Sequence, residues 1–324
     1  MCNILAMNLK NNFLIKGLII MKILVSDGIA PQGEEILKNA GHEVVKHFYS
    51  PEELISNIKD YDAIMVRSAT KVRKDVIDAG NLKVIARAGV GLDNIDVQYA
   101  KDKGIEVLNT PAASSISVAE LTIAHAMGIG RFLHRSKAEM VNGNWPKKDF
   151  AAGREVTGKT LGIIGFGNIG QEVAKRAKGL MMDVLVYNKY NETHGLDVTL
   201  GTFDDVIEKS DYISLHIPFR KEVGAVLSDK EFEKMKDGVV IINCARGGTI
   251  DEKALLNALN SGKVSSAAID VFETEPAGED QKELINHPNV AVTPHIGAST
   301  NEAQLRVSTE IATKVVDALK NVSS

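Results

Sequence analysis

The sequence predicts an α/β protein built from two modules of similar construction. Short apolar runs rich in β-forming residues alternate with amphipathic stretches along most of the chain, as they do in βαβ units. Several of these runs are almost continuously apolar, which is typical of strands buried on both faces of a parallel sheet. A chain of 324 residues is long enough for about two such domains.

The first module is expected to begin at Met21, where MKILVSD reads as the start of a strand. Its expected strands are residues 22–27, 43–48, 62–68, 83–89 and 106–111. A helical pattern covers residues 31–40, and a second helix is predicted to start at Pro51 with Ser50 as its N-cap.

A long helix is expected from about Ser117 to Val141. Ser117 and Glu120 form an S-x-x-E pattern, which predicts a capping box at the helix start. The run Asn142-Gly143-Asn144 is expected to end the helix.

The second module begins with TLGIIGFG and repeats the alternation of strand and helix. Its expected strands are residues 160–167, 183–188, 211–218, 238–245, 265–272 and 289–295. Residues 301–320 predict a final amphipathic helix, because one of its faces would carry Leu305, Ala312, Val316 and Leu319.

The composition excludes several functional classes. Apolar residues make up 44% and charged residues 25%, as in an ordinary folded protein, and the net charge is −4. Without a long basic run, no nucleic acid is expected as a partner. The two cysteines, Cys2 and Cys244, are too few and too far apart for a disulfide scaffold or a structural zinc site, so we expect no metal and a reducing, cytoplasmic location.

The first twenty residues precede the first module and are expected to be a dispensable extension. The apolar stretch that runs from Phe13 to Val25 is interrupted by Lys16 and Lys22, so it is too short to span a bilayer. No cleavage site of the A-x-A type follows, which is a poor fit to a secretory signal. No membrane association is therefore expected, and truncation to Met21 is expected to preserve activity.

A glycine-rich loop carries the first functional signal. Gly165, Gly167 and Gly170 form G-x-G-x-x-G directly after an apolar strand and before a helix, which is the context of a dinucleotide-binding loop. The helix N-terminus would supply N–H donors and a positive dipole to a pyrophosphate. A tight turn that binds nothing is the alternative interpretation.

The residue expected to hold the adenosine ribose is unusual. An acidic residue is typical about 20 positions after the first glycine, but Asn188 stands there, followed by Lys189. Asparagine can bond a 2′-hydroxyl, whereas Lys189 could attract a 2′-phosphate. NAD is the expected cofactor, and NADP stays open.

Polar residues follow three strands of the second module. Arg246 comes directly after the expected strand 238–245, and Glu275 lies beyond the expected strand that ends near Asp270. His295 is the last residue of the expected strand 289–295. Ligands of open α/β sheets bind beyond the carboxyl ends of the strands, so these groups can converge there. Histidine, glutamate and arginine suit an acid–base group, its charged partner and a carboxylate clamp.

These motifs together resemble a known family. GIIGFGNIG, SLHIP, NCARGG, DVFETEP and TPHIGAST, in that order, are similar to the D-isomer-specific 2-hydroxyacid dehydrogenases. RSATKV, RAGVGLDNID and NTPAASSISVAELT are closest to its short-type D-3-phosphoglycerate dehydrogenase branch. The resemblance covers the chain from Met21 onward.

The resemblance implies roles for individual residues. His295 would exchange the proton of the substrate's C2 oxygen, Glu275 would stabilise the imidazolium, and Arg246 would hold the substrate carboxylate. The implied cofactor-binding residues are Val90, Gly165, Gly167, Asn168, Ile169, Gly170, Asn188, Ile217, Cys244, Ala245, Asp270 and Gly297. The implied substrate-binding residues are Arg67, Ser68, Val90, Gly91, Arg246 and His295. The Arg67 guanidinium and the Ser68 hydroxyl suit a phosphate.

The resemblance also implies an architecture. Two Rossmann/flavodoxin-like, doubly wound domains are expected, with the NAD-binding domain (residues 120–300) inserted in a substrate domain made of residues 21–119 and 301–324. The helix predicted over residues 117–141 would serve dimerisation, giving a homodimer or a dimer of dimers. No regulatory domain follows Ser324, so the serine feedback of longer relatives is not expected.

The expected activity is NAD-dependent oxidation of 3-phospho-D-glycerate to 3-phosphohydroxypyruvate, which opens serine biosynthesis. A glyoxylate or hydroxypyruvate reductase, or another D-2-hydroxyacid dehydrogenase, is the alternative enzyme. A more remote alternative is an NAD(H)-sensing, corepressor-like binding protein, which would bind NADH without turning over any small 2-oxo acid.

Overall fold

The computed structural model describes residues 20–322, which divide into two compact units. The first unit comprises residues 20–88, 92–109 and 308–322, and the second comprises residues 89–91 and 110–307. The predicted dispensable extension lies, apart from Ile20, outside the described residues.

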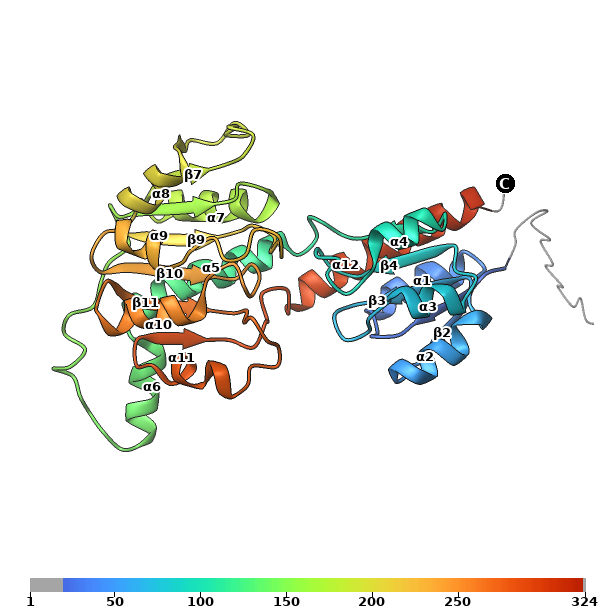
Figure 1. Ribbon diagram of the computed structural model, residues 1–324, viewed down its shortest axis with the longest axis horizontal. Coiled ribbons are helices and arrows are strands. Elements are labelled where there is room, and N and C mark those ends of the chain that lie inside the picture. Colours follow the sequence, from blue (N-terminus) through green and yellow to red (C-terminus); the bar gives the residue numbers. More distant parts are fainter. Residues whose placement is uncertain (1–19, 323–324) are drawn as a thin grey trace, which may run out of the picture. The chain divides into compact units, whose positions relative to one another are not determined.

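The first unit contains a five-stranded parallel sheet with the order β2-β1-β3-β4-β5 (Figure 1). Its strands are β1 (Lys22–Val25), β2 (Glu43–Lys46), β3 (Ala63–Val66), β4 (Val84–Arg87) and β5 (Glu106–Leu108). Its helices are α1 (Pro31–Asn39), α2 (Pro51–Asn57), the 3-10 helix η1 (Ile58–Asp60), α3 (Lys74–Ala79) and α4 (Val97–Asp102). All four residues of β3 are buried, as expected for a strand covered on both faces.

The start of α2 confirms the predicted N-cap. The Ser50 hydroxyl accepts a hydrogen bond from the Glu53 N–H at 3.4 Å, and the Glu53 carboxylate accepts one from the Ser50 N–H at 3.0 Å. Pro51 is the first helical residue, where its missing N–H costs nothing.

The second unit contains a seven-stranded parallel sheet with the order β12-β11-β10-β9-β6-β7-β8 (Figure 1). Its strands are β6 (Thr160–Ile164), β7 (Asp183–Tyr187), β8 (Thr199–Leu200), β9 (Tyr212–Leu215), β10 (Val239–Asn243), β11 (Val264–Ile269) and β12 (Val290–Val292). Its helices are α5 (Ser115–Gly130), α6 (Leu133–Val141), α7 (Asn168–Gly179), α8 (Phe203–Lys209), α9 (Asp229–Lys234), α10 (Glu252–Asn260), η2 (Glu279–Gln281), α11 (Lys282–Asn286) and the start of α12 (Asn301–Val322).

Two hydrophobic layers cover the two faces of this sheet. Val240 and Ile242 of β10 pack in a layer with α5 and α7, whereas Val239 and Ile241 pack in a layer with α8, α9, α10 and α11. This alternation along one strand explains why the predicted runs are apolar throughout.

The long helix predicted over residues 117–141 is wrong in two respects. The structure forms α5 and α6, separated at Phe132, whose backbone is left-handed with a φ of 55°. Because α5 already begins at Ser115, Ser117 lies inside the helix and is not its cap. Its hydroxyl instead contacts the Thr300 hydroxyl at 2.7 Å.

No single helix among the described residues is long and apolar enough to span a membrane. The pair α5 and α6 passes that test only when taken together, and the two helices are bent by 62° at their junction.

The compact units divide at residues 109/110 and 307/308, whereas the resemblance placed the divisions at 119/120 and 300/301. The segment before residue 120 belongs with the second unit because Val118 and Ala119 are buried in its core. Residues 89–91 also group with the second unit, although they directly follow β4 of the first.

Candidate functional site

The two sheets each have a position where the strand order reverses direction. In the first sheet this switch point lies between β1 and β3, and in the second it lies between β6 and β9. Open α/β sheets bind their ligands beyond the strand ends at such points. The glycine loop follows β6, and Arg67 follows β3, so both predicted ligand-binding segments lie at switch points.

The glycine loop leaves space above the first turn of α7. Gly165 has a φ of 97°, and a Cβ there would lie 2.5 Å from the His216 carbonyl oxygen. A Cβ at Gly170 would lie 2.3 Å from the Gly165 carbonyl oxygen. A Cβ at Gly167, by contrast, would meet no other described atom within 4 Å. This open cradle at a helix N-terminus fits the pyrophosphate of a dinucleotide.

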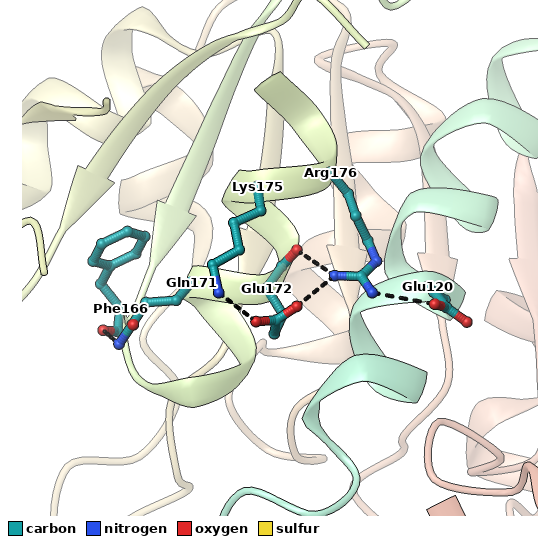
Figure 2. Close-up of polar contacts among 6 residues, drawn as sticks. All are labelled: Glu120, Phe166, Gln171, Glu172, Lys175 and Arg176. Atoms are coloured by element: carbon teal, nitrogen blue, oxygen red, sulfur yellow. Dashed lines mark hydrogen bonds and ion pairs between the residues drawn. The ribbon is translucent and has the colours of Figure 1, made fainter. Parts of the chain in front are cut away.

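The helix behind the glycine loop is tied to α5 by charged side chains (Figure 2). The Arg176 guanidinium contacts the Glu172 carboxylate at 2.6 Å and the Glu120 carboxylate of α5 at 3.1 Å. Lys175 contacts the other Glu172 oxygen at 2.6 Å. The hydrogen bonds from Lys175 and Arg176 hold the pKa of Glu172 below its usual value, against the opposing effect of burial. Glu120, expected in a capping box, therefore joins two helices instead.

The first turn of α7 holds Asn168 and Ile169, the two residues that follow Gly167. The Asn168 amide donates to the Pro111 carbonyl at 3.2 Å. The side chain of Ile169 packs against the layer that contains α5 and α7.

Asn188 follows β7 and is engaged within its own loop. Its amide nitrogen donates to the Glu192 carbonyl at 3.1 Å, and its oxygen accepts from the Tyr190 N–H at 3.2 Å. It lines an open cavity of about 720 Å³ that Asp204 and Asp205 also line. The Asp204 carboxylate pairs with Lys234 at 2.9 Å, and the Asp205 carboxylate is bonded by Thr202 and Lys209.

The remaining predicted cofactor residues of the second unit follow β9, β10 and β12. Ile217 is half-buried after β9, and Cys244 and Ala245 are buried after β10. Burial raises the pKa of the Cys244 thiol to about 12, so the thiol is neutral at physiological pH and is a packing group. Gly297 is buried after β12.

Val90 and Gly91 lie in the turn after β4 that groups with the second unit. The Thr110 N–H donates to the Gly89 carbonyl at 3.0 Å, which joins this turn to the start of residues 110–307.

His295 and Glu275 form a close pair. The Nδ1 atom of His295 lies 2.7 Å from Oε2 of Glu275, and both side chains remain more than one third exposed. Burial tends to raise the pKa of Glu275, but the hydrogen bond and charge of His295, with a smaller contribution from Arg246, hold it below its usual value. Because Glu275 engages Nδ1, proton exchange with a ligand falls to Nε2.

Arg246 lies in the turn after β10, and Asn243 holds that turn. The Asn243 amide donates to the Arg246 carbonyl at 3.1 Å, and its oxygen accepts from the Ala245 N–H at 3.0 Å. Asn243 was not predicted as a site residue. An asparagine at the end of a buried strand was the only signal, because such a residue tends to bond the turn that follows.

Asp270 is 1% exposed, and its carboxylate organises the segment that carries His295. It accepts hydrogen bonds from the Thr293 hydroxyl at 2.5 Å, from the Ile296 N–H at 2.9 Å and from the Gly297 N–H at 2.9 Å. A carboxylate offers about four acceptor positions. One position thus remains for a donor such as a nicotinamide carboxamide.

In the first unit, Arg67 and Ser68 lie in a turn held from both sides. The Asp27 carboxylate accepts from the Arg67 N–H at 2.6 Å and from the Thr70 N–H at 3.1 Å. The Asn94 amide donates to the Arg67 carbonyl at 2.8 Å and to the Thr70 carbonyl at 2.6 Å. Sequence reasoning missed Asp27 and Asn94, which lie 40 and 27 positions from Arg67.

Comparison with known proteins gives the class of this chain. The model of the D-isomer specific 2-hydroxyacid dehydrogenase NAD-binding domain matches residues 123–297, and the chain belongs to this family. It is accordingly an NAD-dependent oxidoreductase of the D-2-hydroxyacid dehydrogenase type.

Individual relatives point to more than one substrate. The chain is 47% identical to a hydroxypyruvate reductase of Thermotoga maritima, with 91% of this chain and 97% of the relative covered. It is 45% identical to a D-3-phosphoglycerate dehydrogenase of Archaeoglobus fulgidus over 93% of this chain, but spans only 58% of that relative. A solved glyoxylate reductase structure from Paecilomyes thermophila matches with a TM-score of 0.85 and 32% identity, covering 93% of this chain and 96% of the other.

Proposed function

We propose that the protein oxidises 3-phospho-D-glycerate to 3-phosphohydroxypyruvate with NAD, the first step of serine biosynthesis. The observation that carries this proposal is the Arg67–Ser68 turn at the switch point of the first sheet. Asp27 and Asn94 hold the Arg67 backbone at this position, and its guanidinium with the Ser68 hydroxyl suits a phosphate, because arginine bonds phosphate oxygens through two parallel N–H groups. Relatives named D-3-phosphoglycerate dehydrogenase at 43–45% identity support the same substrate.

Three residues of the second unit are proposed to act on the substrate. Arg246 binds the carboxylate and the C2 oxygen. His295 accepts the C2 hydroxyl proton at Nε2 during oxidation and returns it during reduction, while Glu275 stabilises the imidazolium through Nδ1. When bound, the nicotinamide ring supplies the acceptor for the hydride that leaves C2.

The cofactor is proposed to lie along residues of the second unit alone. The glycine loop with Asn168 and Ile169 would hold the pyrophosphate, and Asp270 would accept a hydrogen bond from the carboxamide. Val90, Asn188, Ile217, Cys244, Ala245 and Gly297 complete the proposed cofactor contacts. Gly91 is proposed to contact the substrate.

We propose that NAD is preferred over NADP. Asp204 and Asp205 line the cavity beside Asn188, and their negative charge disfavours a 2′-phosphate there, although Lys234 and Lys209 pair with the two carboxylates. Lys189 is the one feature of this loop that favours the opposite preference. The ratio of kcat/KM for NADH to that for NADPH tests this proposal directly.

A hydroxypyruvate reductase is the second candidate. The 47% identity over 97% of the Thermotoga maritima relative favours it, because that relative is covered almost completely. The two candidate substrates share a three-carbon skeleton and differ by one phosphate, so the phosphate contact decides between them.

A reduction assay with 3-phosphohydroxypyruvate, hydroxypyruvate and glyoxylate tests the proposal. Arg67→Ala is expected to lower kcat/KM for the phosphorylated substrate at least about 10-fold and to leave hydroxypyruvate reduction within about twofold. Lys38→Ala is the control, because Lys38 is a cation of the same unit in the last turn of α1, where it pairs with Glu34 at 3.7 Å. A wild-type enzyme that prefers hydroxypyruvate, with equal losses for both substrates in Arg67→Ala, would establish the second candidate.

We further propose a cytoplasmic homodimer or dimer of dimers. Met127, Leu133, Met140, Val141 and Trp145 of α5, α6 and the loop that follows are exposed apolar side chains. Such a concentration is typical of a protein–protein contact. Val141→Asp is expected to lower the sedimenting mass, whereas Phe48→Asp, a charge placed at an exposed apolar residue of the first unit, is not.

A further inference from the structure

A buried chain of three side chains leads from α5 to the turn that carries His295. His125 Nε2 lies 3.1 Å from the Thr293 hydroxyl oxygen, and that hydroxyl donates to Asp270 Oδ1 at 2.5 Å. His125 is only 9% exposed and Asp270 only 1%. The chain therefore joins residues that are far apart in sequence, and its two ends, His125 and Asp270, are buried while Thr293 is partly buried.

The protons along this chain can be assigned. A carboxylate has only acceptor positions, so the single hydroxyl proton of Thr293 is committed to Asp270. The Thr293 oxygen must then accept from His125, which requires the proton of the imidazole to be on Nε2. Burial lowers the pKa of His125, so this neutral tautomer prevails at physiological pH.

Asp270 and Thr293 are also hydrogen-bonded to the backbone of His295. The His295 N–H donates to the Asp270 carbonyl at 2.8 Å and to the Thr293 carbonyl at 3.1 Å. His295 itself has a φ of 52°, a left-handed conformation that costs free energy in a residue other than glycine. Thr293 and Asp270 thus hold the backbone of His295 in a conformation that it would rarely adopt alone.

We propose that His125 and Thr293 are positioning residues, which orient the Asp270 carboxylate and, through it, the turn that presents His295. This inference rests on the proposed roles of Asp270 and His295. It explains why a histidine is buried in α5, where its desolvation is unfavourable unless its N–H group has a partner. Neither side chain touches the substrate in this role.

The first test removes the links of the chain one at a time, with whichever 2-oxo acid the wild type reduces. Thr293→Val and His125→Leu are each expected to lower kcat about 10- to 100-fold while KM for that acid changes less than about threefold, because the reactive groups are misplaced and not removed. Thr293→Ser and His125→Gln keep the hydroxyl and the N–H donor, and are expected to restore most of kcat.

His287→Leu is the matched control. It removes an imidazole that accepts from the Asn289 N–H at 3.1 Å, at the opposite end of β12. It is expected to leave kcat within about twofold. If Thr293→Val and His125→Leu lower only thermal stability and the folded enzyme keeps its kcat, the two residues are structural and the proposal fails.

A second readout needs no turnover. With ¹⁵N-labelled histidine, the His125 ring in the NADH-bound wild type is expected to show the neutral Nε2–H tautomer, and Thr293→Val is expected to shift that signal. A His125 ring protonated on Nδ1 alone would overturn the inference even in an active enzyme. Absence of activity toward all three oxo acids, with the expected signal present, would instead count against the proposed function.

Discussion

The turns after β1 and after β6 occupy the same place in two doubly wound sheets, but they differ in chemistry. After β6, three glycines leave open space at the N-terminus of α7. After β1, the Asp27 carboxylate is bonded to the neighbouring Arg67–Thr70 turn, and the N-terminus of α1 is covered: the Ser308 hydroxyl accepts from the Ala30 N–H at 2.9 Å. α1 also starts with Pro31, which lacks an N–H.

The difference shows two ways of using one topological position. The second unit exposes backbone N–H groups to a ligand, which suits the phosphates of a dinucleotide whatever base it carries. The first unit fills the same position with its own side chains, and the proposed recognition there falls to the Arg67 guanidinium and the Ser68 hydroxyl. Side-chain recognition is the more selective device, since it depends on the shape and charge of one small substrate.

The largest effect is expected from removing His295, the proposed acid–base group of the second unit. His295→Asn is expected to lower kcat about 10²- to 10⁴-fold, because it removes the acid–base group, while the Kd for NADH changes less than about threefold. Stopped-flow single-turnover rates and calorimetric titration measure the two quantities. A kcat within threefold of wild type would rule out the proposed role.

The next prediction separates the open turn from the covered one. Gly167→Ala is expected to raise the Kd for NADH about 10-fold or more with little loss of stability, since the added methyl group meets no described protein atom but enters the phosphate space. Gly33→Ala in α1 is expected to lower thermal stability and to leave the Kd for NADH unchanged, because its Cβ would lie 2.7 Å from the Ser308 carbonyl oxygen. Thermal unfolding and NADH titration of both variants provide the check, and equal behaviour of the two would contradict the distinction.

A pH profile tests the His295–Glu275 pair. The hydrogen bond and charge of His295 lower the pKa of Glu275, so its carboxylate is charged at neutral pH and lies 2.7 Å from Nδ1 of His295. In the proposed reduction His295 donates a proton, which a neighbouring carboxylate favours, so Glu275→Gln is expected to lower the reduction rate about 10-fold near pH 8 and less near pH 6.

The control for this profile is Glu279→Gln, which alters an exposed glutamate paired with Lys282 at 3.1 Å. Because the folded protein lowers the pKa of Glu275, the charged carboxylate stabilises the fold. The contribution of Glu275 is present above its unfolded pKa and disappears as the pH falls through its folded value. Parallel rate profiles for wild type and Glu275→Gln would exclude the ion pair from the reaction.

The smallest effect is expected in the first unit. Asp27→Asn weakens the carboxylate bonds to the Arg67 and Thr70 N–H groups, so KM for 3-phosphohydroxypyruvate is expected to rise about 3- to 10-fold, with an unchanged Kd for NADH. Asp60→Asn, at an exposed position of η1, is the control. A change confined to NADH binding would show that the two turns do not divide their tasks as proposed.

Much of the fold could be predicted because its signals are local. Ser50 and Pro51 mark a helix start within four residues, and the buried strands of a parallel sheet are apolar throughout. The expected strands are present, although each ends earlier than predicted, since the predicted ranges took in the first residues of the following turn, such as Ser26 and Asp27 after β1. β8 was missed because two residues are too few for a periodic pattern.

The prediction of a single helix over residues 117–141 was wrong because a contact with a distant part of the chain, and not a local signal, ends α5. Its apolar residues continue in helical spacing past Gly130, where α5 ends. Phe132 then adopts a left-handed backbone conformation, and a new helix, α6, begins at Leu133. A Cβ at Gly130 would lie 3.3 Å from the Arg154 carbonyl oxygen, which shows how closely a distant loop approaches there. No periodicity within the helix reports such a contact.

The sequence by itself determined the α/β class, the glycine loop and the residue types His295, Glu275 and Arg246, because each depends on a short pattern of neighbouring residues. Only the tertiary structure decided what supports them. Asp27 and Asn94 behind Arg67, and His125 and Thr293 behind Asp270, are joined by hydrogen bonds between residues distant in sequence. Such bonds form only after the sheets have brought their strand ends together, so no local pattern records them.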